Sequence, residues 1–195
     1  MEIIHHRRNT IELLNSTPTS MGVEIDIRSY NKKLVIHHDP FLEGIDFEEW
    51  IKRYNHGTLI LNVKEEGLEE KILEILSKFR IKKFFFLDQS FPFLIKTAKK
   101  GESRCAIRLS EYESIETVLT LKNLVKWVWV DFFTKFPLDK DSYSKLKTNK
   151  FNICLVSPEL QGYDKKYIDI IKNILKKEKI IVEAVCTKKP LEWIK

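Results

Sequence analysis

Short apolar runs recur along the chain at nearly regular intervals, and each has the length of a β-strand rather than that of a helix. Polar segments of helix-forming composition separate them, as is typical of strands connected by helices. Eight such runs are found, at residues 3–4, 23–27, 59–63, 84–87, 105–109, 125–130, 153–156 and 180–185.

Several of the intervening segments have helical periodicity. Residues 70–79 and 167–175 carry apolar side chains at three- and four-residue spacing, which predicts two amphipathic helices. Ser114, Asp139 and Asp164 come just before predicted helices and have side chains that cap a helix N-terminus. Shorter helices are predicted at residues 10–14, 47–53, 93–99, 114–121 and 140–147.

This alternation predicts an α/β fold with a parallel sheet. Eight strands close a (β/α)8 TIM barrel, and 195 residues are at the lower size limit for one, so we expect short or missing helices. The alternative is an open doubly wound sheet, which needs fewer strands and usually has a glycine-rich first turn. Because the chain contains neither GxGxxG nor GxxxxGK, we favour a single compact barrel domain over residues 1–195.

Composition narrows the class of protein. The chain is 43% hydrophobic and 32% charged, which suits one globular domain with a substantial core. Its net charge of +6 is not accompanied by an aromatic-basic motif, so we expect a lysine-rich surface and no nucleic-acid binding. No window approaches ~18 apolar residues, from which we expect a cytoplasmic protein without membrane insertion. The sequence carries no signal for the oligomeric state.

The three cysteines indicate structural thiols. Cys105, Cys154 and Cys186 are widely spaced, and each lies within an apolar run. No CxxC spacing is present that would indicate a zinc site. We therefore expect these thiols to be buried and reduced.

Two carboxylates in one apolar run are the most informative feature of the chain. Glu24 and Asp26 are two residues apart, so both point to the same side of a strand. A buried strand rarely carries two acids on one face unless a cation or hydrogen bonds neutralise them. A further short run at 34–36 leads to His37, His38 and Asp39. Two acids with a nearby imidazole indicate a metal site beside an acid/base group.

Polar side chains also end the other runs, where a parallel barrel forms its active site. By strand parity, His5 and His37 should point away from the centre of the barrel. Ion pairs are the plainer alternative: the two acids with Arg7 or Arg28, and Arg108 with Glu111 or Glu113. The remaining run-end residues are Asn62, Lys64, Asp88, Asp131, Ser157, Glu159, Thr187 and Lys188.

The order of these residues resembles the glycerophosphodiester phosphodiesterase family, within the phosphatidylinositol-phospholipase-C-like phosphodiesterases. The chain reads His6-Arg7 and then Asn9-Thr10, where the family has His-Arg-Gly and then Glu-Asn-Thr. Glu24-Ile25-Asp26-Ile27 is similar to the family's Glu-x-Asp-Val strand, and His38-Asp39-Pro40 to the His-Asp strand that follows it. Residues 182–190 resemble the closing strand, which in the family usually ends Thr-Asp-x-Pro.

The resemblance implies a barrel that hydrolyses phosphodiesters with a divalent cation. His6 and His38 would be the general acid and base, and Glu24 and Asp26 would be metal ligands. Hard oxygen ligands of this kind favour Mg²⁺ or Ca²⁺. In a glycerol diester the nucleophile is either water or the neighbouring hydroxyl of the substrate, which gives a cyclic phosphate first.

The same resemblance places cations around the phosphate group. Lys64 matches a family lysine that faces a phosphate oxygen, and we expect Arg7 and Arg108 to bind phosphate as well. The compact barrel favours a small phosphodiester as the substrate.

Three departures from the family pattern matter. Arg8 replaces the glycine after His-Arg, and residues 31–33 replace an Asp-Gly turn. Asn62 stands where the family has its third acidic ligand, so that position supplies an oxygen without a negative charge. The competing hypothesis is therefore a barrel that has lost catalysis and binds a phosphorylated ligand or a partner protein.

Overall fold

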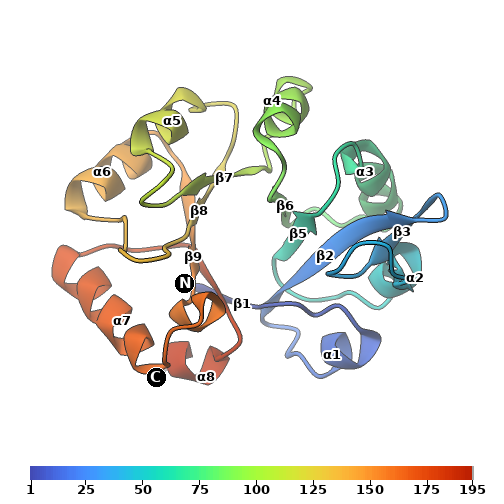
Figure 1. The fold of residues 1–195 in the computed structure, drawn as a ribbon, viewed down its shortest axis with the longest axis horizontal. Coiled ribbons are helices and arrows are strands. Elements are labelled where there is room, and N and C mark those ends of the chain that lie inside the picture. The colour runs from blue at the N-terminus through green and yellow to red at the C-terminus, as the bar shows by residue number, and fades with distance from the viewer. Residues whose placement is uncertain (195) are drawn as a thin grey trace.

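A computed structural model describes residues 1–194, and eight parallel strands form its centre. They curl around a common axis, with the helices outside them (Figure 1). Each predicted apolar run overlaps one of these strands. The strands are β1 (Glu2–His5), β2 (Gly22–Tyr30), β5 (Leu59–Val63), β6 (Phe84–Leu87), β7 (Ala106–Leu109), β8 (Trp127–Val130), β9 (Asn152–Val156) and β10 (Ala184–Thr187).

One seam interrupts the sheet. β6 and β7 meet at a single isolated bridge between Phe86 and Cys105, where Phe86 N donates to Arg104 O at 2.8 Å. Every other neighbouring pair of these strands is joined by a ladder. The structure thus confirms a curled parallel α/β sheet, whereas a fully closed barrel remains a prediction.

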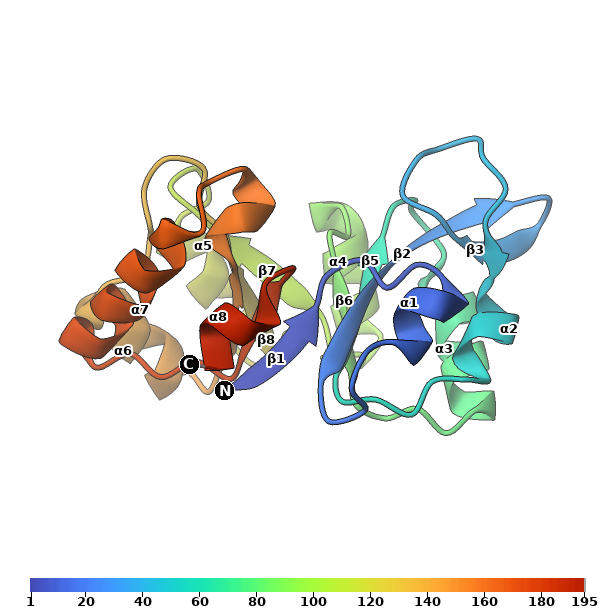
Figure 2. The ribbon, with the colours of Figure 1, turned by 90° about the horizontal axis from the view of Figure 1, so that it is seen from below.

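Short helices cover the outside of the sheet, as the length of the chain led us to expect (Figure 2). Caps hold their first turns: Ser114 accepts from Thr117 N at 3.3 Å, and Asp139 accepts from Ser142 N at 2.8 Å. The helices are α1 (Ile11–Asn15), α2 (Phe47–Ile51), α3 (Glu69–Lys78), α4 (Phe91–Lys99), α5 (Ile115–Thr120), α6 (Lys140–Thr148), α7 (Lys166–Glu178) and α8 (Pro190–Ile194), with a 3₁₀ turn η1 (Pro158–Gln161).

Some predicted bounds were wrong. The last run was expected to be strand from residue 180, but β10 begins only at Ala184, and β8 begins at Trp127 rather than at residue 125. Apolar side chains before both strands are buried in the connections that lead into them, so hydrophobicity alone did not mark the start of the ladder. The short elements β4 (Ile45–Asp46), η1 and α8 were not predicted.

A hairpin branches from β2. The strand continues to Tyr30 and returns as β3 (Lys33–Ile36), which pairs with it in antiparallel register. Asn31 and Lys32 occupy the two-residue turn with φ angles of 47° and 65°, as a type I′ turn requires. The residues that replace the Asp-Gly turn therefore still make a tight hairpin, which brings His38 back beside Asp26 of β2.

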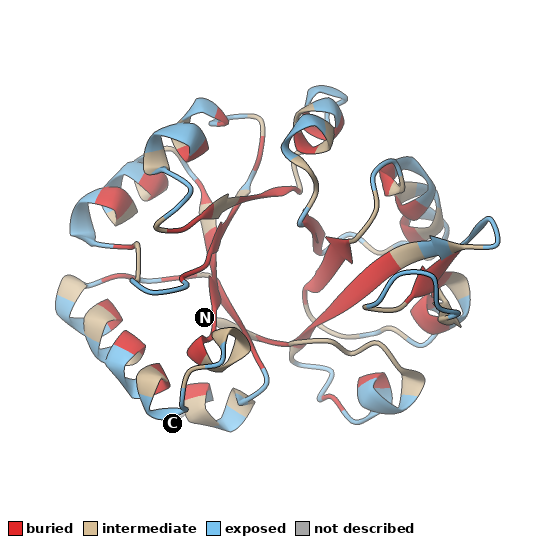
Figure 3. Cartoon of the chain, viewed as in Figure 1, coloured by how far each residue is buried: buried red, intermediate tan, exposed pale blue. Residues whose placement is uncertain are grey.

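Alternation along the strands separates two apolar layers. On β2, Val23, Ile25 and Ile27 are fully buried in the outer core between sheet and helices, so Glu24 and Asp26 point inward. Buried strands dominate the ring in Figure 3, and a smaller core fills its interior. That inner core consists of Ile4, Ile60, Phe85, Leu87, Ala106, Trp129, Cys154, Val156, Ala184 and Cys186.

Candidate active site

A polar cavity of about 260 Å³ lies at the carboxyl ends of the strands, above the inner core. Residues from all eight strands, or from the loops directly after them, line it. This is the end of a parallel barrel-like sheet at which enzymes form their active sites. The lining residues are His6, Arg7, Glu24, Asn62, Lys64, Leu87, Asp88, Arg108, Trp129, Asp131, Val156, Leu160, Gln161 and Lys188.

Glu24 is a fully buried acid on one wall of the cavity. Its carboxylate accepts from Arg7 N at 2.7 Å and from Asn62 Nδ2 at 3.0 Å. Burial, followed by the negative charge of Asp26, raises the pKa of Glu24 to about 7. The backbone at Arg7 has a φ of 51°, which turns its amide toward this carboxylate. Hydrogen bonds rather than a cation therefore satisfy Glu24.

Asp26 is equally buried but has cationic neighbours. Asn9 holds it from two sides, with Nδ2 donating to Asp26 Oδ2 at 2.9 Å and Oδ1 accepting from Asp26 N at 3.0 Å. Lys64 Nζ lies 3.2 Å from Oδ1, and Arg7 Nε lies 3.4 Å from Oδ2. Burial alone would raise the pKa of Asp26, but the hydrogen bond from Asn9 and the charge of Lys64 lower it. The ion pair with Arg7 that the sequence offered as an alternative is thus present, although for Asp26 alone.

The two proposed catalytic histidines have different surroundings. His6 lines the cavity, with Nε2 3.7 Å from Glu24 Oε2 and with Nδ1 buried and lacking a hydrogen-bond partner. Burial, then the positive charges of Arg7 and Lys188, lower the pKa of His6 to about 3. The imidazole is therefore neutral near pH 7 and has the form that accepts a proton.

His38 does not line this cavity. It lies on the wall of a neighbouring pocket, with Nδ1 3.4 Å from Asp26 Oδ2. Its Nε2 is 2.9 Å from Nη2 of Arg7, whose side chain contacts both His38 and the cavity. The sequence correctly grouped His38 with Asp26, but in this arrangement Arg7 occupies the Nε2 side of the ring.

The outward histidines behave as strand parity predicts. His5 Nδ1 contacts Arg8 Nη2 at 2.7 Å, on the opposite side of β1 from the cavity. His37 Nδ1 accepts from Asp39 N at 3.0 Å in the loop after β3. Neither ring lines the cavity that holds His6.

Arg108 is fixed by acids on neighbouring strands. It forms ion pairs with Asp88 after β6 and with Asp131 after β8, the latter at 3.2 Å between Nη1 and Oδ2. Glu113 lies 3.9 Å from Nε, so one of the two ion pairs considered from the sequence is present at longer range. Gln161 Nε2 donates to Asp131 at 2.6 Å and completes the set.

Glu24, Asp26 and Asn62 are the residues that could hold a hard divalent cation, although Asp26 does not line the cavity. β2 and β5 are in register, with Asp26 opposite Asn62, so oxygen atoms of Glu24, Asp26 and Asn62 come from adjacent strand ends. Asn62 Oδ1 is buried without a hydrogen-bond partner, and no cation pairs with Glu24, since the nearby His6 is neutral. Among residues 1–194, no group of three or more His, Cys, Asp and Glu side chains forms a metal cluster. Asn62 Oδ1 is therefore the oxygen that could complete a set of ligands with Glu24 and Asp26.

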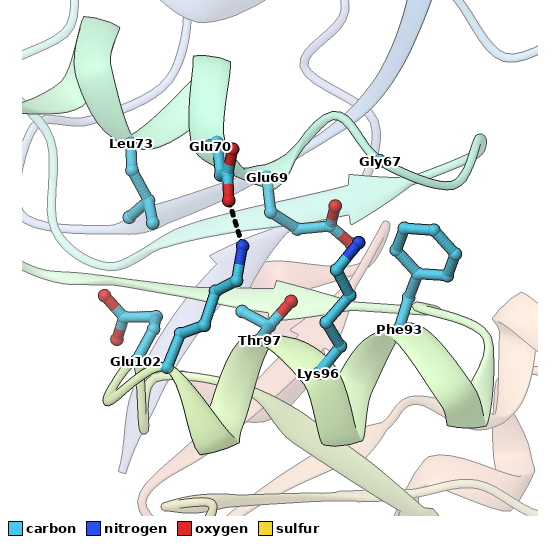
Figure 4. A pocket seen from close by; sticks show the side chains of 9 residues that line it. Gly67, Glu69, Glu70, Leu73, Phe93, Lys96, Thr97 and Glu102 are labelled. Atoms are coloured by element: carbon cyan, nitrogen blue, oxygen red, sulfur yellow. Dashed lines mark hydrogen bonds and ion pairs between the residues drawn. The ribbon is translucent and has the colours of Figure 1, made fainter.

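A second, smaller pocket of about 150 Å³ lies outside the sheet between α3 and α4 (Figure 4). An ion pair between Lys100 and Glu70 crosses it, and Phe93 and Leu73 supply apolar surface. No histidine lies on its described wall, and the residues singled out from the sequence are all elsewhere. The chemistry is concentrated in the polar cavity.

Comparison with solved structures agrees with this arrangement. A glycerophosphodiester phosphodiesterase from Agrobacterium tumefaciens superposes with a TM-score of 0.69 at 12% identity, covering 98% of this chain and 97% of that one. A glycerophosphoryl diester phosphodiesterase from Parabacteroides distasonis gives 0.67 at 13% identity, covering 98% and 84%. A Galdieria sulphuraria protein provisionally assigned to the same class gives 0.73 at 14%, covering 99% and 96%.

This chain has the fold of the glycerophosphodiester phosphodiesterases. The resemblance found in the sequence is thus confirmed at the level of the fold. No protein-family model matches the sequence, and no curated protein is significantly similar to it. Identities of 12–14% leave the assignment of individual residues to the geometry of the cavity.

Several residues of the site were not selected from the sequence. Asn9 belongs to the Asn-Thr pair that resembles the family, and its contacts with Asp26 show why an asparagine suits that position. Gln161 is in the unpredicted η1 turn, and its residue type and spacing contained no signal that separated it from surface residues. Lys188 was among the polar residues that end the predicted apolar runs, but no role was predicted for it.

No helix within residues 1–194 has the length and apolarity needed to cross a membrane.

Proposed function

We propose that the protein is a divalent-cation-dependent phosphodiesterase acting on a small glycerophosphodiester-type substrate. The observation that carries the proposal is the cavity itself, where a buried acid, an unpartnered amide oxygen and a neutral histidine lie together with four cationic side chains. A phosphodiester is an anion whose cleavage requires charge neutralisation and proton transfer, and these groups supply both. The fold shared with phosphodiesterases agrees with this chemistry.

Glu24, Asp26 and Asn62 would hold the cation, Mg²⁺ or Ca²⁺ by ligand chemistry. Once bound, such an ion neutralises charge on the diester and makes its phosphorus more electrophilic. The ammonium of Lys64 already lies beside Asp26, and in this proposal it turns toward a phosphate oxygen. Arg7 and Arg108 bind the phosphate from other sides of the cavity.

His6 acts as the base, since its ring is neutral and faces the cavity. It takes the proton from the attacking hydroxyl, either of water or of the glycerol moiety with a cyclic phosphate as the first product. His38 would protonate the leaving alkoxide. For that step the guanidinium of Arg7 must leave His38 Nε2, which it contacts at 2.9 Å. Phosphate binding by Arg7 would provide that movement.

A closed (β/α)8 barrel is part of the same proposal. Arg108 on β7 pairs with Asp88 after β6, so an ion pair spans the seam on the side of the active site. Ligand binding to Arg108 would hold the two strands near each other at this end.

The test is release of alcohol from glycerophosphodiesters such as glycerophosphocholine, with Mg²⁺ or Ca²⁺ and with or without a chelator. The proposal predicts turnover that the chelator abolishes and that His6→Ala lowers by about 10²–10⁴-fold. His56→Ala is the matched control, because His56 contacts Thr17 O away from the cavity. Turnover that is indifferent to chelator and to His6→Ala would contradict the mechanism.

One observation favours a second candidate, a barrel that binds a phosphorylated ligand without hydrolysing it. Asn62 satisfies Glu24 through hydrogen bonding, and Lys64 neutralises Asp26, so the site is balanced without an ion. In that case the protein would bind inorganic phosphate in the presence of chelator and would turn over none of the diesters tested.

A further inference from the structure

Lys188 is a cation of the cavity that has no acidic partner. It directly follows β10, lines the cavity and has an exposed side chain. Among residues 1–194, no carboxylate lies within ion-pair distance of its ammonium group. The other cavity cations differ, since Arg7 and Lys64 pair with Asp26, and Arg108 pairs with acids on two strands.

The backbone of Lys188 is held firmly although its side chain is free. Its amide donates to Glu159 Oε1 at 2.8 Å, and the same oxygen accepts from Thr187 Oγ1 at 2.5 Å. Ser157 Oγ donates to the other oxygen of Glu159 and itself accepts from Trp193 Nε1 at 2.8 Å. Glu159 is thus occupied by neutral donors, and it fixes the start of the Lys188 side chain rather than neutralising its charge.

The same region of backbone joins Lys188 to His6. β1 and β10 are parallel neighbours in which His5 is in register with Thr187, and His6 N donates to Thr187 O at 3.0 Å. His6 and Lys188 are therefore the next residues on two adjacent strands, and both line the cavity. An ammonium group so placed lies beside the group that we assign as the base.

A lysine fixed at its backbone, exposed into a cavity and lacking a counter-ion is complementary to an anionic ligand. We propose that Lys188 Nζ binds a non-bridging oxygen of the substrate's phosphate group, next to His6. The identity of that anion as a phosphodiester rests on the proposed function, whereas the anion-binding role of Lys188 rests on the geometry alone. Lys188 is then a substrate-binding residue in addition to Arg7, Lys64 and Arg108.

The first experiment measures binding of inorganic phosphate by isothermal titration calorimetry in wild type, Lys188→Gln and Lys189→Gln. Lys189 is the matched control, because it is the adjacent exposed lysine and does not line the cavity. We expect Lys188→Gln to weaken phosphate binding about tenfold, as befits loss of one charge-assisted contact, and Lys189→Gln to leave it unchanged. Lys188→Arg should retain most of the affinity. Equal affinities for the Lys188→Gln and Lys189→Gln proteins would overturn the inference.

A second experiment separates contact with the diester phosphate from contact with another anionic group of the substrate. If Lys188 binds the phosphate, Lys188→Gln raises KM by the same factor for glycerophosphocholine and for glycerophosphoserine, whose head group carries a carboxylate. An increase confined to glycerophosphoserine would overturn the assignment to phosphate.

The two proposals can fail separately. If wild type hydrolyses no diester but loses phosphate affinity on Lys188→Gln, the phosphodiesterase function fails and the binding role of Lys188 stands. If wild type hydrolyses diesters and Lys188→Gln changes neither KM nor phosphate affinity, the function stands and this inference is wrong.

Discussion

Asn62 donates its side-chain amide to Glu24, with Nδ2 3.0 Å from Oε1, and keeps its own Oδ1 buried without a hydrogen-bond partner. One residue thus both donates a hydrogen bond to the neighbouring acid and presents a free oxygen. An ionised aspartate at this position could not donate a hydrogen bond to Glu24. It would instead add a third negative charge beside Glu24 and Asp26, which a bound cation would have to balance.

Asn62→Asp should therefore make stability depend on the metal. Without added ion, repulsion among three buried acids should lower the melting temperature, since like charges at close range oppose burial. With Mg²⁺ or Ca²⁺, the variant should gain more thermal stability than wild type does. Differential scanning calorimetry with and without chelator measures both effects. Asn55→Asp, at an exposed loop position, is the control; an identical metal response in the two variants would contradict the ligand assignment.

Asn9→Ala should destabilise the fold by about 2 kcal/mol, because Asp26 loses one charged hydrogen bond and its backbone amide loses an acceptor. Urea denaturation at neutral pH measures the free energy of unfolding, and Asn55→Ala is the control. The loss should be smaller at a pH low enough to protonate Asp26. A change below about 0.5 kcal/mol would show that the two contacts contribute little.

Glu111 should make stability sensitive to acid. Its carboxylate accepts from the backbone amides of Phe133 at 3.0 Å, Thr134 and Lys135. Burial acts to raise the pKa of Glu111, but hydrogen bonds from its own amide and from this loop together lower it to about 2. Because the pKa of Glu111 is lower in the folded protein than its value of 4.5 in the unfolded chain, the ionised carboxylate stabilises the folded state above about pH 4.5. This contribution to the free energy of unfolding is lost as the pH falls toward 2.

The measurement is the difference in unfolding free energy between wild type and Glu111→Gln across that range. Wild type should be the more stable of the two at about pH 5, and the difference should shrink on acidification. Because other acids titrate in both proteins, only the difference is informative. A difference that stays constant with pH would show that Glu111 does not have the lowered pKa.

The three thiols should be inert in the folded protein. Cys105, Cys154 and Cys186 are free and buried, as their positions in apolar runs predicted, and burial raises the pKa of each thiol. Ellman's reagent should titrate none of them within minutes in native buffer and all three in denaturant. Ser16→Cys, at an exposed position, supplies the positive control. Rapid reaction of native wild type would contradict the burial of these side chains.

Strand parity explains how much of the site could be predicted from the sequence. Because alternate residues of a strand face opposite sides, Glu24 and Asp26 had to point together once their apolar neighbours faced the helices. The same rule turned His5 away from the cavity. These predictions used only local geometry, which the sequence determines directly.

Contacts between side chains on separate loops could not be predicted in this way. Arg7 meets His38 across 31 positions of sequence, and that contact depends on the positive φ of Arg7 and on the hairpin after β2. The weak junction of β6 with β7 was also not foreseen, because both runs are as apolar as those that form full ladders. Periodicity identifies a strand but does not show how completely its neighbour pairs with it.

The junction of β6 with β7 is the one place where the ladder of peptide hydrogen bonds around these eight strands is interrupted. Apart from the bridge at Phe86, no ladder connects the peptide groups of β6 to those of β7. A cavity of about 320 Å³ lies there, lined in part by Phe91, Leu94 and Ile107. At this point the wall of the active-site sheet is held by side chains, among them the ion pair of Asp88 with Arg108, rather than by a ladder of peptide hydrogen bonds.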